Sequence, residues 1–298
     1  SHSESLPERK PEIIFAVPLV IDKIIRKHIF PLIQTNRVRL LMNMPVINKR
    51  IKEKIRDFVL SEFGGKACQV VVGGAPLNKE IESFLTNISF PIAMAYGTTE
   101  TAPFITFANA EEYVPGSCGV SVNHLDVKVL SKDPQNVPGE LVCKGICVMQ
   151  GYYKNQEATK EILWGDWLLT GDMARMDEDG FIYLVDRKKD VIISGGENIY
   201  PVQIEDFLRK NNKIKDVAVI GLPDTRLGEI SAAIIEIKEG FECSEAEINE
   251  FCLGLPRYKR PRKVIFDKIP RNPTGKIEKP VLRKRYYHGR LVEAQITR

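Results

Sequence analysis

Two loops rich in small and polar residues are the first candidates for chemistry. "AYGTTETAP" (95–103) continues the apolar run "PIAMAYG", and "GGAP" (73–76) follows the apolar run "ACQVVV". If both runs are strands of one parallel sheet, the loops lie at the carboxyl ends of the strands, where open α/β sheets bind ligands. Small hydroxyl residues there can approach phosphate, Glu100 can hold a magnesium ion, and glycines let a flat ring approach the backbone. Each loop taken alone is equally compatible with a polar turn.

Three charged residues farther along the chain form a second group of candidates. Asp172 follows a Thr-Gly turn, and Arg187 stands beyond the next apolar run, so the two side chains could bind the two hydroxyls of a ribose. The alternative interpretation is a turn former and a surface charge. "RNPTGKIEK" (271–279) places Lys276 directly after a stiff Pro-Thr-Gly turn, although a solvated lysine is favoured for these residues alone.

The first 110 residues alternate apolar runs with helical patterns, which predicts a parallel sheet with helices on its faces. Pro76 suits the first turn of a helix over 77–85, and Gly64 and Gly65 are a helix stop. The expected strands are 12–18, 67–72 and 91–97, and the expected helices are 19–30, 48–63 and 77–85.

The remaining sequence divides into a β-rich part and an α+β part. Short strands are expected at 126–130, 139–145, 166–176 and 180–186, with "DEDG" (177–180) as a tight turn. A boundary near 186–190 precedes new strands at 191–195, 216–222 and 231–238. Helices are expected at 201–211 and after Ser244, which has the spacing of a capping box with Glu247. We therefore expect an α/β fold: a partial doubly wound α/β subdomain (1–110), a small β-subdomain (111–186) and a separate α+β C-terminal lid domain (187–298).

The composition excludes several classes of protein. The chain has 298 residues, 43% hydrophobic and 28% charged, which is ordinary for a soluble globular protein. The net charge of +4 does not indicate nucleic-acid binding, and the basic stretch 276–285 is expected to be a solvated helix face. No apolar run has the length of a membrane-spanning helix, no signal peptide opens the chain, and the six cysteines show no C-x-x-C pair. A cytoplasmic location is expected, and the oligomeric state is not predicted.

Six motifs occur in an order that resembles the adenylate-forming superfamily, which includes acyl-CoA synthetases, adenylation domains of peptide synthetases, and firefly luciferase. The resemblance covers nearly the whole chain. The motifs are Tyr96–Glu100, Gly139–Leu141 leading to Gly151-Tyr152, Thr170–Asp172, Asp186–Asp190, Gly195–Asn198 and Pro273–Lys276.

The resemblance implies a two-step reaction that uses ATP, Mg²⁺ and coenzyme A. A carboxylate attacks the α-phosphate of ATP to give an acyl-adenylate and pyrophosphate, and the thiol of coenzyme A then attacks the acyl carbon. Negative charge builds up during the first step, so a fixed cation should stabilise that transition state. Lys276 resembles the lysine that supplies this cation.

The resemblance also implies a role for each motif residue. Gly73, Gly74, Ala75 and Pro76, with Tyr96, Gly97 and Thr98, resemble the wall that binds adenine. Thr99 resembles the residue near the α-phosphate, Glu100 the magnesium carboxylate, and Asp172 and Arg187 the ribose contacts. Lys189 matches the hinge about which the C-terminal domain turns between half-reactions, and Gly195, Gly196 and Glu197 match the loop that faces the pantetheine tunnel of coenzyme A.

One family motif is absent from this sequence. The Ser/Thr/Gly-rich loop that cradles the β- and γ-phosphates of ATP is missing, and no G-x-x-x-x-G-K-[ST] sequence replaces it. The chain is therefore expected to be the C-terminal portion of a larger ligase and to be inactive alone. Long- or medium-chain fatty acids are the expected substrates. The alternatives are an aryl-CoA ligase or an amino-acid adenylation domain, a luciferase-like oxidation, or a non-catalytic AMP-binding remnant.

Overall fold

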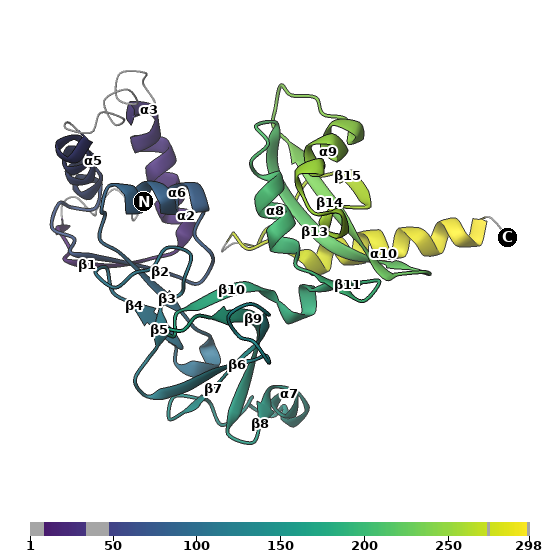
Figure 1. Ribbon diagram of the computed structural model, residues 1–298, viewed down its shortest axis with the longest axis horizontal. Coiled ribbons are helices and arrows are strands. Elements are labelled where there is room, and N and C mark those ends of the chain that lie inside the picture. The colour runs from purple at the N-terminus through teal and green to yellow at the C-terminus, as the bar shows by residue number, and fades with distance from the viewer. Residues whose placement is uncertain (1–8, 34–47, 273–274, 297–298) are drawn as a thin grey trace. The chain divides into compact units, whose positions relative to one another are not determined.

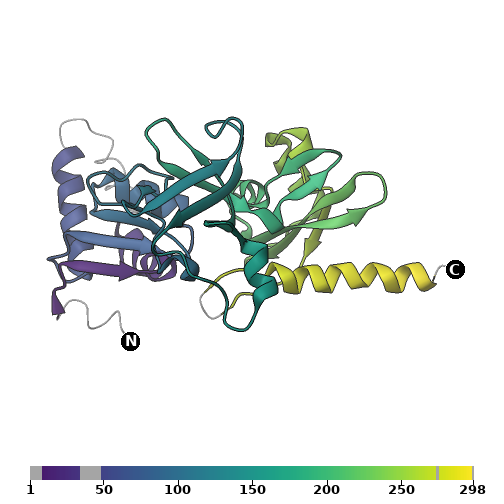
Figure 2. The same ribbon diagram turned by 90° about the horizontal axis from the view of Figure 1, so that it is seen from below.

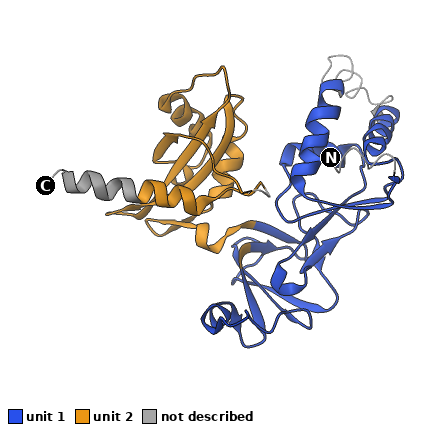
Figure 3. Ribbon diagram, turned by 180° about the vertical axis from the view of Figure 1, so that it is seen from behind, with its two compact units in different colours: residues 1–170, 174–184 blue, residues 171–173, 185–298 orange. Residues whose placement is uncertain are grey.

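The structure is a computed structural model and describes residues 9–33, 48–272 and 275–296. It divides into two compact units (Figure 3). Unit 1 comprises residues 1–170 and 174–184, and unit 2 comprises residues 171–173 and 185–298. Among the described helices, none combines the length and hydropathy needed to cross a bilayer.

Unit 1 begins with a five-stranded sheet of order β1-β2-β3-β4-β5 (Figure 1). Its first three strands are parallel to one another, as the alternating pattern predicts, whereas β4 is antiparallel to β3 and β5 is antiparallel to β4. The strands are β1 (Ile13–Ala16), β2 (Gln69–Gly73), β3 (Ile92–Tyr96), β4 (Thr106–Ala108) and β5 (Val120–Ser121).

The helices between β1 and β3 in the chain pack on one face of this sheet. Val70 and Val72 of β2 belong to the large core beneath the helices, whereas Val71 belongs to a small cluster on the opposite face. This division follows from the period of two along a strand. Since Phe15 of β1 is 69% exposed, the described helices cover one face of the sheet and not both as expected. The helices are α2 (Pro18–Ile24), which continues through π-helical Ile25–Ile29 into α3 (Phe30–Ile33), α5 (Asn48–Glu62) and α6 (Lys79–Asn87).

The start of α6 corrects one detail of the sequence interpretation. Pro76 was expected in its first turn, but the helix begins at Lys79 and Asn78 is the N-cap. The Asn78 side chain accepts hydrogen bonds from the N–H groups of Glu80 and Ile81 at 2.9 and 3.4 Å. An asparagine that satisfies two unpaired donors fixes the first turn more firmly than a proline two residues earlier. Pro76 therefore remains in the loop that leaves β2.

A second sheet follows, of order β10-β9-β7-β6 with β8 paired to β9. The "DEDG" turn predicted between its last two strands is present, because the Gly180 N–H donates to the Asp177 carbonyl at 3.2 Å. α7 (Gln156–Ile162) lies between β7 and β8 in the chain. The strands are β6 (Leu125–Leu130), β7 (Gly139–Gly145), β8 (Leu163–Trp164), β9 (Trp167–Met176) and β10 (Ile182–Arg187).

The third sheet lies in unit 2 and has helices on both faces. Its order is β12-β11-β14-β13, with β15 parallel to β14. Val217 and Val219 of β13 pack with α8 and α9, whereas Ala218 and Ile220 pack with α10 on the other side. The elements are β11 (Ile192–Ser194), β12 (Glu197–Ile199), α8 (Pro201–Leu208), β13 (Ile214–Asp224), β14 (Gly228–Ile237), α9 (Glu245–Phe251), β15 (Lys263–Phe266) and α10 (Lys279–Ile296). Ser244 caps α9 through the predicted capping box with Glu247.

Helix α10 is seen lengthwise in Figure 2. Its first turn is partly buried, whereas residues 276–285 were expected to form a solvated helix face. Lys279 is only 8% exposed, and its Nζ lies 2.8 Å from Oε1 of Glu205 in α8. Leu282 is fully buried against β13 and β14. The basic pattern therefore includes one buried ion pair that attaches α10 to the rest of unit 2.

Candidate functional site

The two loops that the sequence singles out begin at one edge of the first sheet. β2 and β3 are parallel, and their register pairs Gly73 with Ala95. "GGAP" therefore leaves β2 at the level where Tyr96 and Gly97 leave β3. The sequence predicts this juxtaposition because parallel neighbouring strands end at the same edge.

The loop after β3 is closed tightly by its own backbone. A Cβ added at Gly97 would lie 1.8 Å from the Pro103 carbonyl oxygen, so glycine is required there. The Thr98 N–H donates to Oγ1 of buried Thr101 at 3.2 Å, which fixes the 3₁₀ turn Thr99–Thr101. Thr99 is exposed on that turn, and Glu100 is half-buried.

The loop after β2 leaves its backbone accessible. Gly74 is exposed with φ of +83°, and a Cβ added there would meet no described atom within 4 Å. Gly73 is different, because its added Cβ would lie 2.9 Å from the Ala95 carbonyl oxygen. Glycine at 73 allows the two strands to approach, and glycine at 74 permits the left-handed turn. The open surface over Gly74 is of the kind that a planar ring could cover.

Glu100 is attached to the segment that follows β7. The Tyr152 hydroxyl donates to Oε1 of Glu100 at 2.7 Å, and the Met149 N–H donates to the Glu100 carbonyl at 2.8 Å. The hydrogen bond to the carboxylate raises the pKa of the Tyr152 phenol above its usual value, so the phenol remains protonated. Among the described residues, no group of three His, Cys, Asp or Glu side chains could hold a metal. One carboxylate nevertheless fits Mg²⁺ when phosphate oxygens and water supply the remaining ligands.

Asp172 and Arg187 are brought together, as the ribose hypothesis requires. Nε of Arg187 lies 3.2 Å from Oδ1 of Asp172. Asp172 is 8% exposed within β9, whereas Arg187 is exposed at the end of β10. A carboxylate that accepts and a guanidinium that donates thus stand side by side, which suits a pair of vicinal hydroxyls.

The segment around Lys189 is attached to helices of unit 2 on both sides. Asp186 is buried, and its carboxylate accepts from the Val202 N–H of α8 at 2.9 Å. Burial raises the pKa of Asp186 above its usual value. The Asp190 carboxylate accepts from Nη2 of Arg283 in α10 at 2.6 Å. Lys189 itself is exposed in the 3₁₀ turn between these two anchors.

Gly195 and Gly196 form the two-residue turn between β11 and β12. Their φ angles are +59° and +89°, and Ser194 pairs with Glu197 across the turn. Positive φ at both central positions is the geometry of a tight hairpin, which favours glycine. The Gly195 N–H also donates to the Leu227 carbonyl at 2.9 Å. The predicted loop is therefore an exposed, well-fixed hairpin tip.

Lys276 is exposed at the end of a turn whose Pro273 and Thr274 lie outside the described residues. Its N–H donates to Oδ1 of Asn272 at 2.8 Å. Arg271 binds the carboxylate of Asp216 in β13 through two bonds, Nε–Oδ2 at 2.8 Å and Nη2–Oδ1 at 2.9 Å. Nη1 of Arg271 also donates to the Gly275 carbonyl. The backbone beside Lys276 is thereby attached to a core strand.

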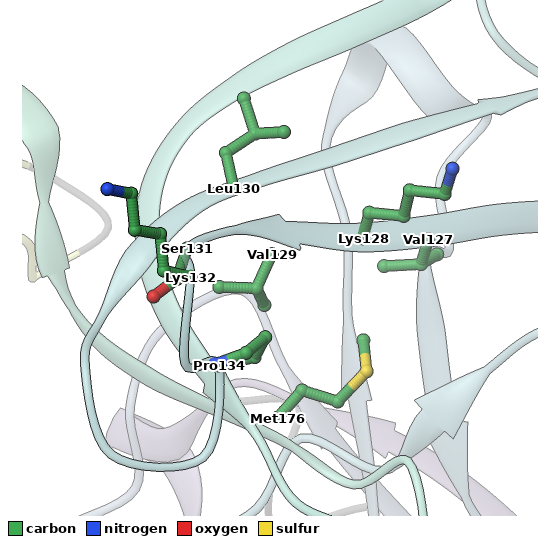
Figure 4. Close-up of a pocket in the computed structure, with 8 residues that line it drawn as sticks. All are labelled: Val127, Lys128, Val129, Leu130, Ser131, Lys132, Pro134 and Met176. Atoms are coloured by element: carbon green, nitrogen blue, oxygen red, sulfur yellow. The ribbon is translucent and has the colours of Figure 1, made fainter.

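The candidate residues are divided between the two units. In unit 1 the structure brings together 73–76 and 96–100; unit 2 holds Asp172 with Arg187, and separately Lys189, Gly195–Glu197 and Lys276. A pocket of about 540 Å³ on the second sheet lies elsewhere in unit 1. It is lined by Val127–Lys132, Pro134 and Met176 and includes none of the candidates (Figure 4).

Three side chains near candidate residues have no role that the sequence predicts. Tyr152 follows Gly151 in a family motif that implies no role for it, and Arg271 and Asp216 belong to no predicted site. Tyr152 is 52 residues from Glu100, and Arg271 is 55 residues from Asp216. A single sequence carries no signal for such pairs beyond the complementary types of the residues.

Comparison with known proteins identifies the class to which this chain belongs. The AMP-binding enzyme family matches residues 3–153, and its C-terminal domain matches residues 203–276. The chain therefore belongs to the AMP-binding, adenylate-forming enzyme family, and the predicted resemblance and α/β fold class are confirmed.

Two similar curated proteins are acyl-CoA ligases. The chain is 40% identical over 223 residues to the long-chain-fatty-acid–CoA ligase FadD13 of Mycobacterium tuberculosis, a match that covers 72% of this chain and 44% of that protein. It is 38% identical over 231 residues to human mitochondrial medium-chain acyl-CoA ligase ACSF2, with 73% and 37% covered. The chain thus spans less than half the length of these relatives.

Solved structures agree with this assignment. o-Succinylbenzoate CoA synthetase from Bacillus subtilis, in complex with an acyl-adenylate, matches with a TM-score of 0.74 and 26% identity over 94% of this chain and 52% of that one. ATP-bound MatB from Rhodopseudomonas palustris matches with a TM-score of 0.74 and 26% identity over 96% of this chain and 52% of that one. A further structure of the Bacillus subtilis enzyme contains ATP and magnesium.

Proposed function

We propose that this chain forms the acyl-adenylate and thioester site of an ATP-dependent acyl-CoA synthetase that acts on medium- or long-chain fatty acids. The observation that carries the proposal is the shared sheet edge, where the β2–β3 register sets "GGAP" beside Tyr96–Glu100. The fatty-acid substrate is supported by the names of the relatives, FadD13 and ACSF2.

Each half of the nucleotide has candidate contacts in this proposal. The adenine ring lies against Gly74 and Tyr96, and the ribose hydroxyls bind to Asp172 and Arg187. Glu100 binds Mg²⁺, which when bound neutralises charge on the phosphates. Lys276 supplies the cation that stabilises the negative charge developing during attack by the carboxylate.

The second half-reaction needs a different part of unit 2. We propose that Lys189 is the hinge residue and that Gly195, Gly196 and Glu197 face the pantetheine arm of coenzyme A when the thioester forms. Both residues of the turn are glycine, so the hairpin tip has no side chain until Glu197. Such a tip can border a narrow channel without blocking it.

Replacement of Lys276 by alanine tests the proposal. In the native protein carrying this chain, Lys276→Ala should abolish pyrophosphate release from fatty acid and ATP, since only this step needs the cation. Thioester formation from a supplied acyl-adenylate should be largely retained. Lys284→Ala, which removes an exposed lysine of α10, is the control. Equal loss of both half-reactions in Lys276→Ala would refute the assigned role.

A panel of fatty acids of increasing chain length tests the substrate. Pyrophosphate release should be fastest with medium or long chains, and aryl or amino acids should give little. The chain assayed alone should release none, because its sequence lacks the loop that cradles the β- and γ-phosphates. A native protein that prefers aryl or amino acids would overturn the fatty-acid assignment. One that binds AMP without any pyrophosphate release would be a non-catalytic nucleotide-binding protein.

A further inference from the structure

The segment from β7 to α7 contacts the Glu100 turn at two points, and only one of them involves the carboxylate. The Met149 N–H donates to the Glu100 carbonyl at 2.8 Å and fixes the backbone. The Tyr152 hydroxyl donates to Oε1 at 2.7 Å and fixes the direction of the side chain. These two bonds can be separated experimentally, because a substitution at 152 leaves the backbone bond intact.

Tyr152 is itself held in place by α7. Its N–H donates to Oγ1 of Thr159 at 2.9 Å, and that hydroxyl donates to the Asn155 carbonyl at 2.8 Å. Thr159 also packs closely at Gly151, where an added Cβ would lie 2.9 Å from the Thr159 methyl carbon. A continuous series of contacts therefore runs from α7 through Tyr152 to the Glu100 carboxylate.

We propose that Tyr152 is a positioning residue that orients the Glu100 carboxylate toward the magnesium ion, and that Thr159 orients Tyr152 in turn. This inference rests on the proposed function, in which Glu100 is the metal ligand. Carboxylates that bind metals usually receive a hydrogen bond from a neighbouring group, and that bond sets both orientation and affinity. The Tyr152 phenol has the required donor and distance.

A purely structural role for Tyr152 predicts a different result. If the phenol only linked the loop after β3 to the segment after β7, its loss would lower thermal stability and reduce all activities together. If it orients a metal ligand, its loss should weaken metal binding specifically. The concentration of Mg²⁺ needed for half-maximal rate should then rise, whereas the KM for the fatty acid should stay unchanged.

The chain offers a matched control in the next residue. Tyr153 is 87% exposed and contacts the Lys154 ammonium through its ring, so Tyr153→Phe removes a hydroxyl from the same segment without touching Glu100. Tyr152→Phe retains the ring and removes only the donor. Glu100→Gln reports on the proposed metal ligand itself.

The probe is Mn²⁺, and the readout is its binding to the native protein with a non-cleavable α,β-methylene ATP analogue, measured by electron paramagnetic resonance. Tyr152→Phe should weaken Mn²⁺ binding about 10- to 100-fold relative to Tyr153→Phe. Thr159→Val should also weaken Mn²⁺ binding. Thr159→Ser, which retains the hydroxyl, should bind Mn²⁺ like the parent protein.

The outcomes separate this inference from the proposed function. If Glu100→Gln weakens Mn²⁺ binding but Tyr152→Phe behaves like Tyr153→Phe, Tyr152 is not a positioning residue. A lower unfolding temperature in Tyr152→Phe without a change in Mn²⁺ binding also shows that Tyr152 does not orient the metal ligand. If Glu100→Gln leaves Mn²⁺ binding unchanged, the metal role in the proposed function is wrong, and the inference falls with it.

Discussion

Replacing Arg271 by alanine should release the turn that carries Lys276. The Arg271 guanidinium binds both carboxylate oxygens of Asp216 and the Gly275 carbonyl, so it joins the turn to β13. Asp216 stays in place without Arg271, because its Oδ1 also accepts from the Val217 N–H at 2.9 Å. Alanine at 271 should therefore loosen the turn more than the strand.

The free energy that the Arg271–Asp216 ion pair contributes to holding the turn follows from its geometry and exposure. Hydrogen bonds to charged groups contribute about 1.5–3 kcal/mol when well shielded. The Arg271 side chain is 41% exposed and that of Asp216 is 15% exposed. Solvent screening therefore reduces the contribution of this ion pair to about 1–2 kcal/mol. The open form of the turn should therefore become roughly 5- to 30-fold more populated.

Hydrogen exchange at the Lys276 amide, followed by NMR, measures this opening without catalysis, because that N–H is bonded to Asn272. Arg271→Ala should exchange roughly 5- to 30-fold faster than the parent. Arg285→Ala is the control, since it removes another exposed cation that pairs with Asp267. Equal exchange in the two variants would refute the anchoring role. In the native protein, Arg271→Ala should slow adenylation while thioester formation from acyl-adenylate is retained.

Two further predictions concern the stability of unit 2. Lys279→Met should lower the free energy of unfolding by roughly 1–3 kcal/mol in urea denaturation, because buried Glu205 loses its nearest cation but keeps Arg209 and the Val219 N–H, and Lys279→Met with Glu205→Gln should recover part of this loss. The contributions of two carboxyl groups to the free energy of unfolding should change in opposite directions with pH, as measured by denaturation at a series of pH values. Burial raises the pKa of Asp186 above 3.8, so its contribution falls as pH rises through the raised value, and Asp186→Asn should remove that fall. The Lys213 ammonium lowers the pKa of Glu247 from 4.5 to about 2, so its contribution is lost as pH falls from about 4.5 toward 2, and Glu247→Gln should remove that loss. Unchanged pH profiles in these variants would contradict the assignments.

The sequence predicts much of the fold because its local signals agree with one another. Apolar runs, the "DEDG" turn and the Ser244 capping box each lie where the pattern places them. Pro76 was placed wrongly in α6 because two start signals lie close together, and the side chain of Asn78 satisfies helix donors that a proline cannot. Local signals thus locate elements better than they locate boundaries.

The positions of the candidate residues were predictable where strand ends and glycines determine them. Parallel strands bring 73–76 beside 96–100, and Gly196 lies in a loop, as the resemblance implied. Gly195 was expected at the end of a strand but forms the turn after β11. The contacts of Tyr152 and Arg271 were not predictable, because each side chain finds its partner across a fold that is built from many other interactions. Lys279 was misassigned for the same reason, since its partner Glu205 lies on another helix.

The contact between Tyr152 and Glu100 also has a consequence for conformational entropy. A glutamate side chain that becomes fixed loses rotamer freedom worth about 1.5–2 kcal/mol. Because the Tyr152 hydroxyl holds the carboxylate in the fold itself, this ordering takes place once, when the chain folds. A glutamate left to rotate would have to be ordered again at every turnover.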